Sequence, residues 1–253
     1  MSNILSLAGR RALVTGASRG LGRHFALTLA HAGARVALAS RSPAALAEVA
    51  LKASTLGPNA AVVALDVTDA GGVERAVADA AEKLEGLDIL VNNAGIAVPK
   101  PALDLTEADW DATVDTDLKG AFLVAQAAAR IMKEQARGGS IVNVASITAF
   151  WPAGQLAAYA AAKAGLVQLT RVLAREWARH AIRVNALAPG YIATDMNREF
   201  FASDAGKKLI QQIPQRTLGQ PADLDGALLL LASEAGRHMT GAVITVDGGL
   251  SLT

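Results

Sequence analysis

The sequence of 253 residues contains no cysteine. This absence excludes disulfide bridges, zinc sites built from thiolates and catalysis by a thiol, and it fits a reducing compartment such as the cytoplasm. An excess of either charge is also missing, because 24 Lys and Arg residues offset 23 Asp and Glu residues to a net charge of +1. Since the chain has no basic run and no basic-aromatic pattern, nucleic acid is not an expected partner.

Histidine is scarce, with four residues in the chain. His24 and His31 fit one face of a predicted helix without a third ligand, and His31 and His180 stand where helices are expected to end. We therefore expect no metal site. The N-terminal residues also lack a charged leader followed by a long apolar stretch, so the sequence predicts no signal peptide and a cytoplasmic location.

Charged side chains are absent from residues 138–162. A stretch of this length raises the question of a membrane span, but Asn143, Pro152, Gly154 and Gln155 interrupt it. A buried strand, a loop and the start of a helix explain the stretch better, and no membrane partner is expected.

Short apolar runs recur along a chain that is 52% hydrophobic and 19% charged. Such runs predict strands buried on both faces of a sheet, and the segments between them have the apolar spacing of helices. The alternation predicts an α/β fold with a parallel sheet, helices on both faces and one domain over residues 1–253. The expected strands begin at Arg11, Arg35, Ala61, Asp88, Ser140, Ile182 and Ala242.

Residues that start and end helices agree with this order. Gly33 follows the first helical segment, Thr106 and Asp109 form a predicted capping box, and Pro221 suits the first turn of a helix. Residues 191–220 form the least regular segment, and we expect them to be a lid over the substrate.

The first predicted strand runs directly into TGASRGLG, whose glycines are Gly16, Gly20 and Gly22. Glycines at such a turn let the backbone approach a pyrophosphate, which the helix N-terminus stabilises. The end of the second strand, where an acid would hold the adenosine ribose, reads Ser40 and Arg41. Arg41 can pair with a 2′-phosphate, and Arg19 can approach it from the glycine turn, so NADP is favoured over NAD.

Tyr159 and Lys163 stand four residues apart in YAAAK, and Ser146 ends the run GSIVNVAS thirteen positions before the tyrosine. Four-residue spacing puts the phenol and the ammonium on one helix face, where the positive charge favours the phenolate. A tyrosine in that setting can act as a general acid or base. The three side chains therefore predict a proton-transfer site.

Together these motifs resemble those of the short-chain dehydrogenase/reductase family over nearly the whole chain. The matching motifs are TG-x-x-x-G-x-G at residues 15–22, NNAG at 92–95, the serine at 146, Y-x-x-x-K at 159–163, PG at 189–190 and VDGG around Asp247. The resemblance implies a Rossmann-type doubly wound sheet of seven parallel strands. It also implies hydride transfer between NADP and a small carbonyl or alcohol.

The resemblance implies a role for each matched position. Tyr159 would be the acid or base, Ser146 would hydrogen-bond the substrate oxygen, and Lys163 would bind the nicotinamide ribose and support the tyrosine. The other implied cofactor contacts are Gly16, Ser18, Arg19, Gly20, Leu21 and Gly22 in the glycine turn, Ser40 and Arg41 after the second strand, Asp66 and Val67 at the adenine, Asn93, Ala94 and Gly95 at the adenosine ribose, and Pro189, Gly190, Ile192 and Thr194 toward the nicotinamide.

One position departs from the family pattern. In the family, an asparagine of an N-x-x-G segment before the serine holds a water of the proton relay, whereas this chain has Asp117 in TDLKG. Aspartate keeps two acceptors but has no amide donor, and a buried carboxylate near Lys163 would alter the coupled titration. We expect that Asp117 accepts the same hydrogen bonds and that activity survives; loss of activity is the alternative.

The sequence predicts an NADP-dependent oxidoreductase that interconverts a secondary alcohol and a ketone. An alternative is a 3-oxoacyl carrier-protein reductase, in which Arg130 and Arg175 would meet an acidic carrier protein. An alternative of another class is a non-catalytic dinucleotide-binding regulatory protein. Asp117 favours that alternative, while retention of the serine, tyrosine and lysine argues against it.

The substrate and the assembly are predicted more coarsely. Trp151, Ala153 and Tyr191 are expected to border a partly apolar pocket beside Ser146, and sugar acids, keto esters and cyclic ketones all fit such a pocket. Residues 240–249 are expected to form the last strand and part of a subunit interface, as the family's usual homotetramer implies.

Overall fold

The computed structural model describes residues 4–194 and 197–253, whose strands form one seven-stranded parallel sheet in the order β3-β2-β1-β4-β5-β6-β7. The strands are β1 Arg11–Thr15, β2 Arg35–Ser40, β3 Ala61–Ala64, β4 Ile89–Asn92, β5 Gly139–Val144, β6 Ile182–Pro189 and β7 Val243–Val246. Each begins within one residue of its predicted start, and the predicted fold class is confirmed.

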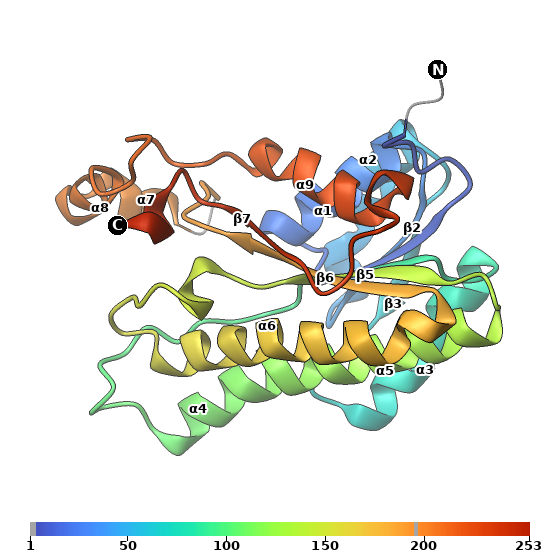
Figure 1. Cartoon of the computed structure of the whole chain (residues 1–253), viewed down its shortest axis with the longest axis horizontal. Coiled ribbons are helices and arrows are strands. Elements are labelled where there is room, and N and C mark those ends of the chain that lie inside the picture. The colour runs from blue at the N-terminus through green and yellow to red at the C-terminus, as the bar shows by residue number, and fades with distance from the viewer. Residues whose placement is uncertain (1–3, 195–196) are drawn as a thin grey trace.

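Helices cover both faces of the sheet (Figure 1). On one face lie α3 Ala70–Leu84, α5 Ala121–Glu134 and α6 Ala157–Trp177, and on the other lie α1 Gly20–His31, α2 Ala47–Leu56 and α9 Asp225–Ala232. Helix α4, Glu107–Val114, continues into the π-helical segment Asp115–Gly120, which leads into α5. Short 3-10 turns span Pro43–Leu46, Ile147–Ala149, Ala178–His180, Pro221–Leu224, Glu234–Gly236 and Leu250–Leu252.

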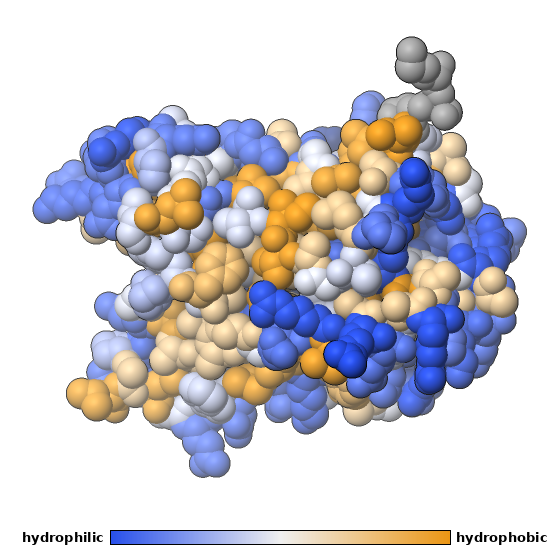
Figure 2. All heavy atoms as spheres, viewed as in Figure 1, coloured by the Kyte–Doolittle hydropathy of each residue, from blue (hydrophilic) through white to orange (hydrophobic). Residues whose placement is uncertain are grey.

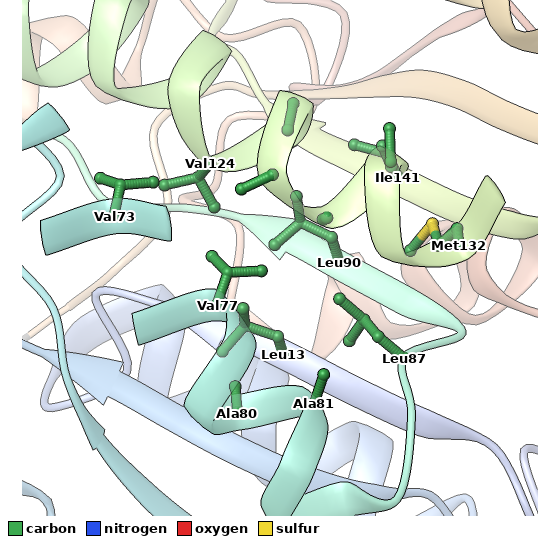
Figure 3. Packing of buried hydrophobic residues seen from close by; sticks show 14 of the residues in the cluster. Leu13, Val73, Val77, Ala80, Ala81, Leu87, Leu90, Val124, Met132 and Ile141 are labelled. Carbon is green, nitrogen blue, oxygen red and sulfur yellow. The ribbon is translucent and has the colours of Figure 1, made fainter. Parts of the chain in front are cut away.

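The core consists of hydrocarbon layers above and below the central strands. Figure 3 shows the layer under α3 and α5, where Leu13 of β1 and Leu90 of β4 meet Val77 of α3 and Val124 of α5. Burial of a side chain of this size contributes roughly 1.5–3 kcal/mol relative to leaving it exposed. The central strands are apolar on both faces because both faces are covered in this way.

The predicted helix boundaries are confirmed. Gly33 follows α1 in the left-handed conformation, with φ of 99°, and the Thr106 side chain accepts a hydrogen bond from the Asp109 amide while Asp109 caps in return. Pro221 begins a 3-10 turn that leads into α9.

The segment predicted as a lid contains two short helices, α7 Arg198–Ala202 and α8 Asp204–Ile210. Residues 195 and 196 of this segment lie outside the described residues. Its two ends are joined, because Ile192 and Gly219 form a β-bridge and the Ala193 amide donates to the Gly219 carbonyl at 2.8 Å. The two ends of the segment therefore lie side by side, outside the strands of the sheet.

The described residues offer neither a membrane-spanning helix nor a cluster of metal ligands. None of their helices is both long and apolar enough to cross a membrane. In the same residues, no three His, Asp or Glu side chains gather closely enough to hold a metal ion.

Candidate active site

The predicted site residues gather at the edge where the parallel strands end. Gly16, Arg41 and Asn93 directly follow β1, β2 and β4, and Ser146 stands two residues after the end of β5. The chain runs outward from β1 to β2 and β3 on one side and from β4 to β7 on the other. Ligands of such sheets bind beyond the carboxyl ends, where the strand order reverses, and this point lies between β1 and β4.

The glycine turn after β1 needs its glycines. Gly16 has φ of 65° and Gly20 has φ of 55°, in the left-handed region that other residues rarely adopt. A Cβ atom at Gly16 would lie 3.0 Å from the Ala94 Cα, and one at Gly22 would overlap the Gly16 carbonyl. The glycine turn thus packs closely against the residues that follow β4 and against the first turn of α1.

Thr15 fastens this turn to β4, a role that the sequence motifs did not assign to it. Its hydroxyl oxygen accepts hydrogen bonds from the amides of Asn93 at 3.0 Å and Ala94 at 2.9 Å. In return, the Asn93 side-chain amide donates to the Thr15 carbonyl at 3.0 Å. A polar residue at the end of an otherwise apolar buried strand was the available signal for Thr15.

The N-terminus of α1 fits an anionic group. Its first turn carries no acidic side chain, and the side chain of Arg19, the N-cap residue, makes no capping hydrogen bond. The first amides of a helix have no carbonyl partner within the helix, so they can donate to a phosphate. Ser18 and Leu21 are half-buried beside them, while Arg19 and Gly20 are exposed.

The predicted adenosine side brings Arg41 close to Asp66. Hydrogen bonds from the amide and hydroxyl of Thr68 lower the pKa of Asp66, and the charge of Arg41 adds to this effect. Ser40 donates its hydroxyl to the Ser42 carbonyl at 2.9 Å, and Val67 is buried beneath the surface. Arg41 thus lies near Asp66 beyond the end of β2, and its contact with a 2′-phosphate stays a prediction.

Ser146 begins the 3-10 turn after β5. Its side-chain oxygen accepts a hydrogen bond from the Thr148 amide at 3.2 Å, and the side chain is 8% exposed. Because this bond uses a lone pair of the oxygen, the serine hydrogen remains available for a substrate oxygen.

Lys163 connects the serine turn with the tyrosine. Its ammonium donates to the Val144 carbonyl at 3.0 Å, two residues before Ser146, and lies 5.4 Å from the centroid of the Tyr159 ring. Lys163 is 4% exposed, whereas Tyr159 is half-buried and reaches solvent. The structure thus brings the three predicted residues to one place.

Asp117 lies in the same place, as the sequence predicted. It is fully buried, and one carboxylate oxygen lies 3.1 Å from the Lys163 Nζ. The other oxygen accepts the Ile96 amide hydrogen at 2.7 Å. Burial raises the pKa of Asp117 against the opposing charge of Lys163 and the hydrogen bond from Ile96.

The predicted nicotinamide side is shaped by Asp247, which lies in the VDGG motif but had no assigned role, and by Asn197, which no motif includes. A Cβ at Gly190, just beyond the last residue Pro189 of β6, would lie 2.6 Å from the Asp247 Cβ. Asn197 donates to the Ile192 carbonyl and accepts from the Thr194 amide, both at 2.8 Å. Neither Asp247 nor Asn197 has a local pattern that indicates these distant or backbone contacts.

The predicted pocket aromatics also stabilise the fold. Trp151 and Tyr191 pack against the buried cluster of Ile147, Ile213 and Leu250. The Tyr191 ring stands edge-on to Phe201 with centroids 5.7 Å apart, and burial raises the pKa of Tyr191. Ala153 is half-buried in the loop after Trp151. Figure 2 shows the surface hollowed at this edge, between the region of α7 and α8 and that of α4.

Comparison with known proteins agrees with this geometry. Residues 16–251 match a family model described as enoyl-(acyl carrier protein) reductase. The chain is 36% identical to 2-dehydro-3-deoxy-D-gluconate 5-dehydrogenase of Dickeya dadantii, over 98% of this chain and 97% of that protein. It is 38% identical to a 3-oxoacyl-(acyl-carrier-protein) reductase of Synechocystis, over 97% and 98% of the two chains.

A solved structure is similar over its full length. Gluconate 5-dehydrogenase from Burkholderia cenocepacia, in complex with NADP and tartrate, superposes with a TM-score of 0.94 at 36% identity, over 99% of this chain and 98% of that one. Sequence and fold are thus similar to those of known proteins along nearly the whole chain.

Proposed function

Because the chain belongs to the short-chain dehydrogenase/reductase family, we propose that it interconverts a secondary alcohol and a ketone with NADP, through Ser146, Tyr159 and Lys163. The observation that carries this proposal is the position of Lys163, whose ammonium contacts both the backbone before the serine and the face of the tyrosine. The reaction described next uses these three side chains and the cofactor.

The bound cofactor supplies or accepts a hydride at the carbon of the carbonyl group. During reduction, Ser146 donates a hydrogen bond to the carbonyl oxygen, and Tyr159 transfers its proton to that oxygen as negative charge develops. The Lys163 ammonium stabilises the phenolate that remains. In the oxidation direction, the Tyr159 phenolate takes the proton from the alcohol while the hydride leaves the carbon.

NADP rather than NAD is the proposed cofactor. The free first turn of α1 and the exposed Arg19 and Arg41 support it, as does NADP in the Burkholderia cenocepacia structure. Replacement of both arginines by alanine should raise the dissociation constant of NADPH by about 10- to 100-fold through loss of charge-assisted hydrogen bonds. NADH binding should change little, because NADH lacks the 2′-phosphate; equal weakening of both would rule out this role.

We propose a sugar acid as the substrate class, since the relatives from Dickeya dadantii and Burkholderia cenocepacia are named for gluconate-type substrates. Trp151, Ala153 and Tyr191 would then border the pocket, and residues 191–220 would close over it. Turnover of sugar acids, keto esters and cyclic ketones with NADPH, and of the matching alcohols with NADP, tests the assignment. Failure of every sugar acid alongside turnover of another group would reassign the substrate.

The catalytic assignment is tested with Tyr159→Phe. The ring and its packing remain, so NADPH binding should persist while most turnover is lost with the transferable proton. Ser146→Ala should cost about 10- to 1000-fold in turnover, through loss of one hydrogen-bond donor. A near-normal rate for Tyr159→Phe would refute the mechanism, and a natural chain that binds NADPH but turns over no substrate would favour the regulatory alternative.

A 3-oxoacyl carrier-protein reductase is the second candidate. Arg130 and Arg175 line one cavity of about 760 Å³ between α5 and α6, away from Ser146, and Arg130 is ion-paired with Glu74. An acidic carrier protein could bind there. If so, alanine at both arginines should weaken turnover of the carrier-bound substrate and leave turnover of a small thioester analogue unchanged.

We also propose a cytoplasmic homotetramer. Strand β7 pairs with β6 and has no second neighbour within the described residues, and its side chains are mostly half-buried. A strand edge of this kind is usually covered, and residues 240–249 could be covered by a symmetry-related copy. Sedimentation that gives a stable monomer at micromolar concentration would contradict this assembly.

A further inference from the structure

Asp117 is a buried carboxylate that the proton transfer described above does not require. It lies in the π-helical segment Asp115–Gly120, where the chain passes from α4 to α5. Such segments are rare, are held in place by surrounding structure and are frequently found at functional sites. The local widening of the helix is therefore a reason to ask what the side chain does.

Each Asp117 oxygen has one neighbour. Oδ1 accepts the Ile96 amide hydrogen at 2.7 Å, and Oδ2 lies 3.1 Å from Lys163 Nζ. The Lys163 contact is a close ion pair rather than a well-aligned hydrogen bond, and Oδ2 has no hydrogen-bond partner in the described part of the chain. The negative charge on this oxygen is thus balanced by Lys163.

The Asp117 carboxylate is closely packed against its neighbours. A Cβ atom at residue 95 would lie 2.8 Å from Asp117 Oδ2, so Gly95 permits the carboxylate to stand against the end of β4. Asp117 is fully buried and Lys163 is 4% exposed, so bulk water screens neither charge. Gly95, Asp117 and Lys163 form one packed unit.

Lys163 is held from two sides by groups of the protein itself. The Val144 carbonyl accepts one N–H, and Asp117 attracts the ammonium from the π-helical segment. Two such anchors fix the direction of the remaining N–H on the Tyr159 side, where the ring centroid is 5.4 Å away. A flexible lysine would otherwise lose side-chain entropy when the cofactor binds.

We propose that Asp117 is a positioning residue, whose carboxylate holds the Lys163 ammonium charged and oriented for the cofactor and for Tyr159. The catalytic part of this inference rests on the proposed function, whereas the ion pair itself does not. Asp117 touches no reacting atom and acts through Lys163.

The ionisation of the pair agrees with this geometry. Burial acts to lower the pKa of Lys163, but the negative charges of Tyr159 and Asp117 outweigh it and raise the pKa. Tyr159 on α6 and Asp117 on the π-helical segment are the ionisable groups that act on the lysine. The Asp117 carboxylate is therefore one of the two groups that favour the ammonium form of Lys163.

The test compares Asp117→Asn with Thr113→Val. Asparagine keeps the shape and the acceptor for Ile96 but removes the charge. Thr113 is equally buried, lies four residues earlier and donates to the Asp109 carbonyl at 2.9 Å, so its replacement by valine removes a buried hydrogen bond without touching Lys163. The two variants separate loss of the charge from loss of a buried polar contact.

NADPH binding and lysine NMR provide readouts that need no substrate. With isotope-labelled lysine, the immobilised Lys163 ammonium should give a resolved signal in the natural chain and in Thr113→Val, assigned by its loss in Lys163→Met. Asp117→Asn should lose or shift that signal and weaken NADPH binding about tenfold, an effect typical of removing a group that orients a ligating side chain. An unchanged signal with unchanged NADPH binding would overturn the proposal.

A double-mutant cycle tests whether Asp117 acts through Lys163. If it does, Asp117→Asn combined with Lys163→Met should bind NADPH no more weakly than Lys163→Met alone. If the two effects multiply, Asp117 contributes independently and the positioning role is wrong. This result stands even if no substrate is found, so it is distinguishable from failure of the proposed reaction.

The pH profile supplies a further readout once a substrate is known. Removing a nearby negative charge makes proton loss from the Tyr159 and Lys163 pair easier, whichever group gives up the proton. The basic limb of the oxidation profile should therefore move to lower pH in Asp117→Asn and stay in place in Thr113→Val. A limb unmoved by Asp117→Asn would reject the electrostatic coupling.

Discussion

Two buried ion pairs stand at opposite ends of the sheet. Arg11 opens β1 and Asp88 precedes β4, so their pair lies at the amino ends of adjacent strands. Lys163 and Asp117 lie at the carboxyl ends, beside Val144 and the residues after β4. Both pairs are nearly free of solvent exposure.

The two pairs differ in the number of hydrogen bonds that their charged groups make. Asp88 accepts from the Arg11 Nε and Nη2 at 2.7 Å each and from the Arg11 amide at 3.0 Å, while Arg11 Nη1 also donates to the Glu85 carbonyl. Burial acts to raise the pKa of Asp88, but the Arg11 hydrogen bonds and charge outweigh it and lower the pKa. At Asp117 the balance is reversed, and the pKa is raised.

This difference separates a structural pair from one suited to chemistry. A bidentate pair, in which all three guanidinium nitrogens donate to partners within the protein, is suited to holding two strands together. A single ion contact beside a tyrosine leaves donors of the Lys163 ammonium that are not committed to Asp117, as the proposed reaction requires. The predictions below test this contrast, from the largest expected effect to the smallest.

Asp88→Ala should produce the largest loss of stability. It leaves the Arg11 guanidinium buried without its carboxylate, which destabilises a folded protein by roughly 3–5 kcal/mol. Urea unfolding measures the change, and NADPH titration of the folded variant should match the natural chain. A loss below about 1 kcal/mol would mean that water or another group satisfies Arg11 and that the pair is not structural.

Replacing each whole pair by apolar side chains should sharpen the contrast. Arg11→Met with Asp88→Leu should restore the free energy of unfolding to within about 1–2 kcal/mol of the natural value, since no unpaired charge remains, and should keep turnover. Lys163→Met with Asp117→Leu should also fold but should lose turnover. Preserved turnover in the second variant would end the functional assignment of that pair.

Acid pH should act on the two carboxylates with opposite sign. Asp88 has a lowered pKa when folded, so its stabilisation is present above the unfolded value near 3.9 and is lost as pH falls. Asp117 has a raised pKa, so its ionisation removes stability as pH rises above that unfolded value.

Free energies of unfolding between about pH 3 and pH 7 check this prediction. The advantage of the natural chain over Asp88→Asn should grow as pH rises, and its advantage over Asp117→Asn should shrink. Parallel slopes for the two variants would contradict the opposite ionisation of the two sites.

The smallest effect is expected at a partly exposed pair, Lys100 with Asp109, whose charged atoms are 2.5 Å apart. Hydrogen bonds from Lys100 and Thr106 lower the pKa of Asp109 to about 2, so the pair stays ionised across neutral pH. Exposed pairs contribute little, and Lys100→Met should move the melting temperature by no more than about 1 °C. A clearly larger and pH-dependent change in melting temperature would mean that this pair contributes to stability as the buried pairs do.

The sequence predicted the site at the carboxyl ends of the strands better than the ion pair at their amino ends. Glycine, serine, tyrosine and lysine spacings indicated the carboxyl-end site, because their chemistry depends on side chains at fixed intervals. The Arg11 and Asp88 pair was not predicted, although each stands at the start of an apolar run, since the two are far apart in sequence. Backbone partners, such as the Ile96 amide and the Val144 carbonyl, have no residue signature at all.

The same reasoning explains why the sequence predicted no helices within residues 191–220. Helices α7 and α8 have five and seven residues, which is too short for the apolar period that identifies longer helices. The Asn197 contacts that shape the start of the segment are local, but asparagine in a loop predicts a turn without saying which carbonyl it binds.

The bridge between Ile192 and Gly219 makes that segment an exchangeable module. Its entry and exit points are fastened together independently of what lies between them, and the cost of loop closure grows only slowly with length. We therefore expect the length of the chain between Ile192 and Gly219 to be variable without a change of strand register. If this segment is the proposed substrate lid, such changes would alter substrate choice and leave the Ser146, Tyr159 and Lys163 site in place.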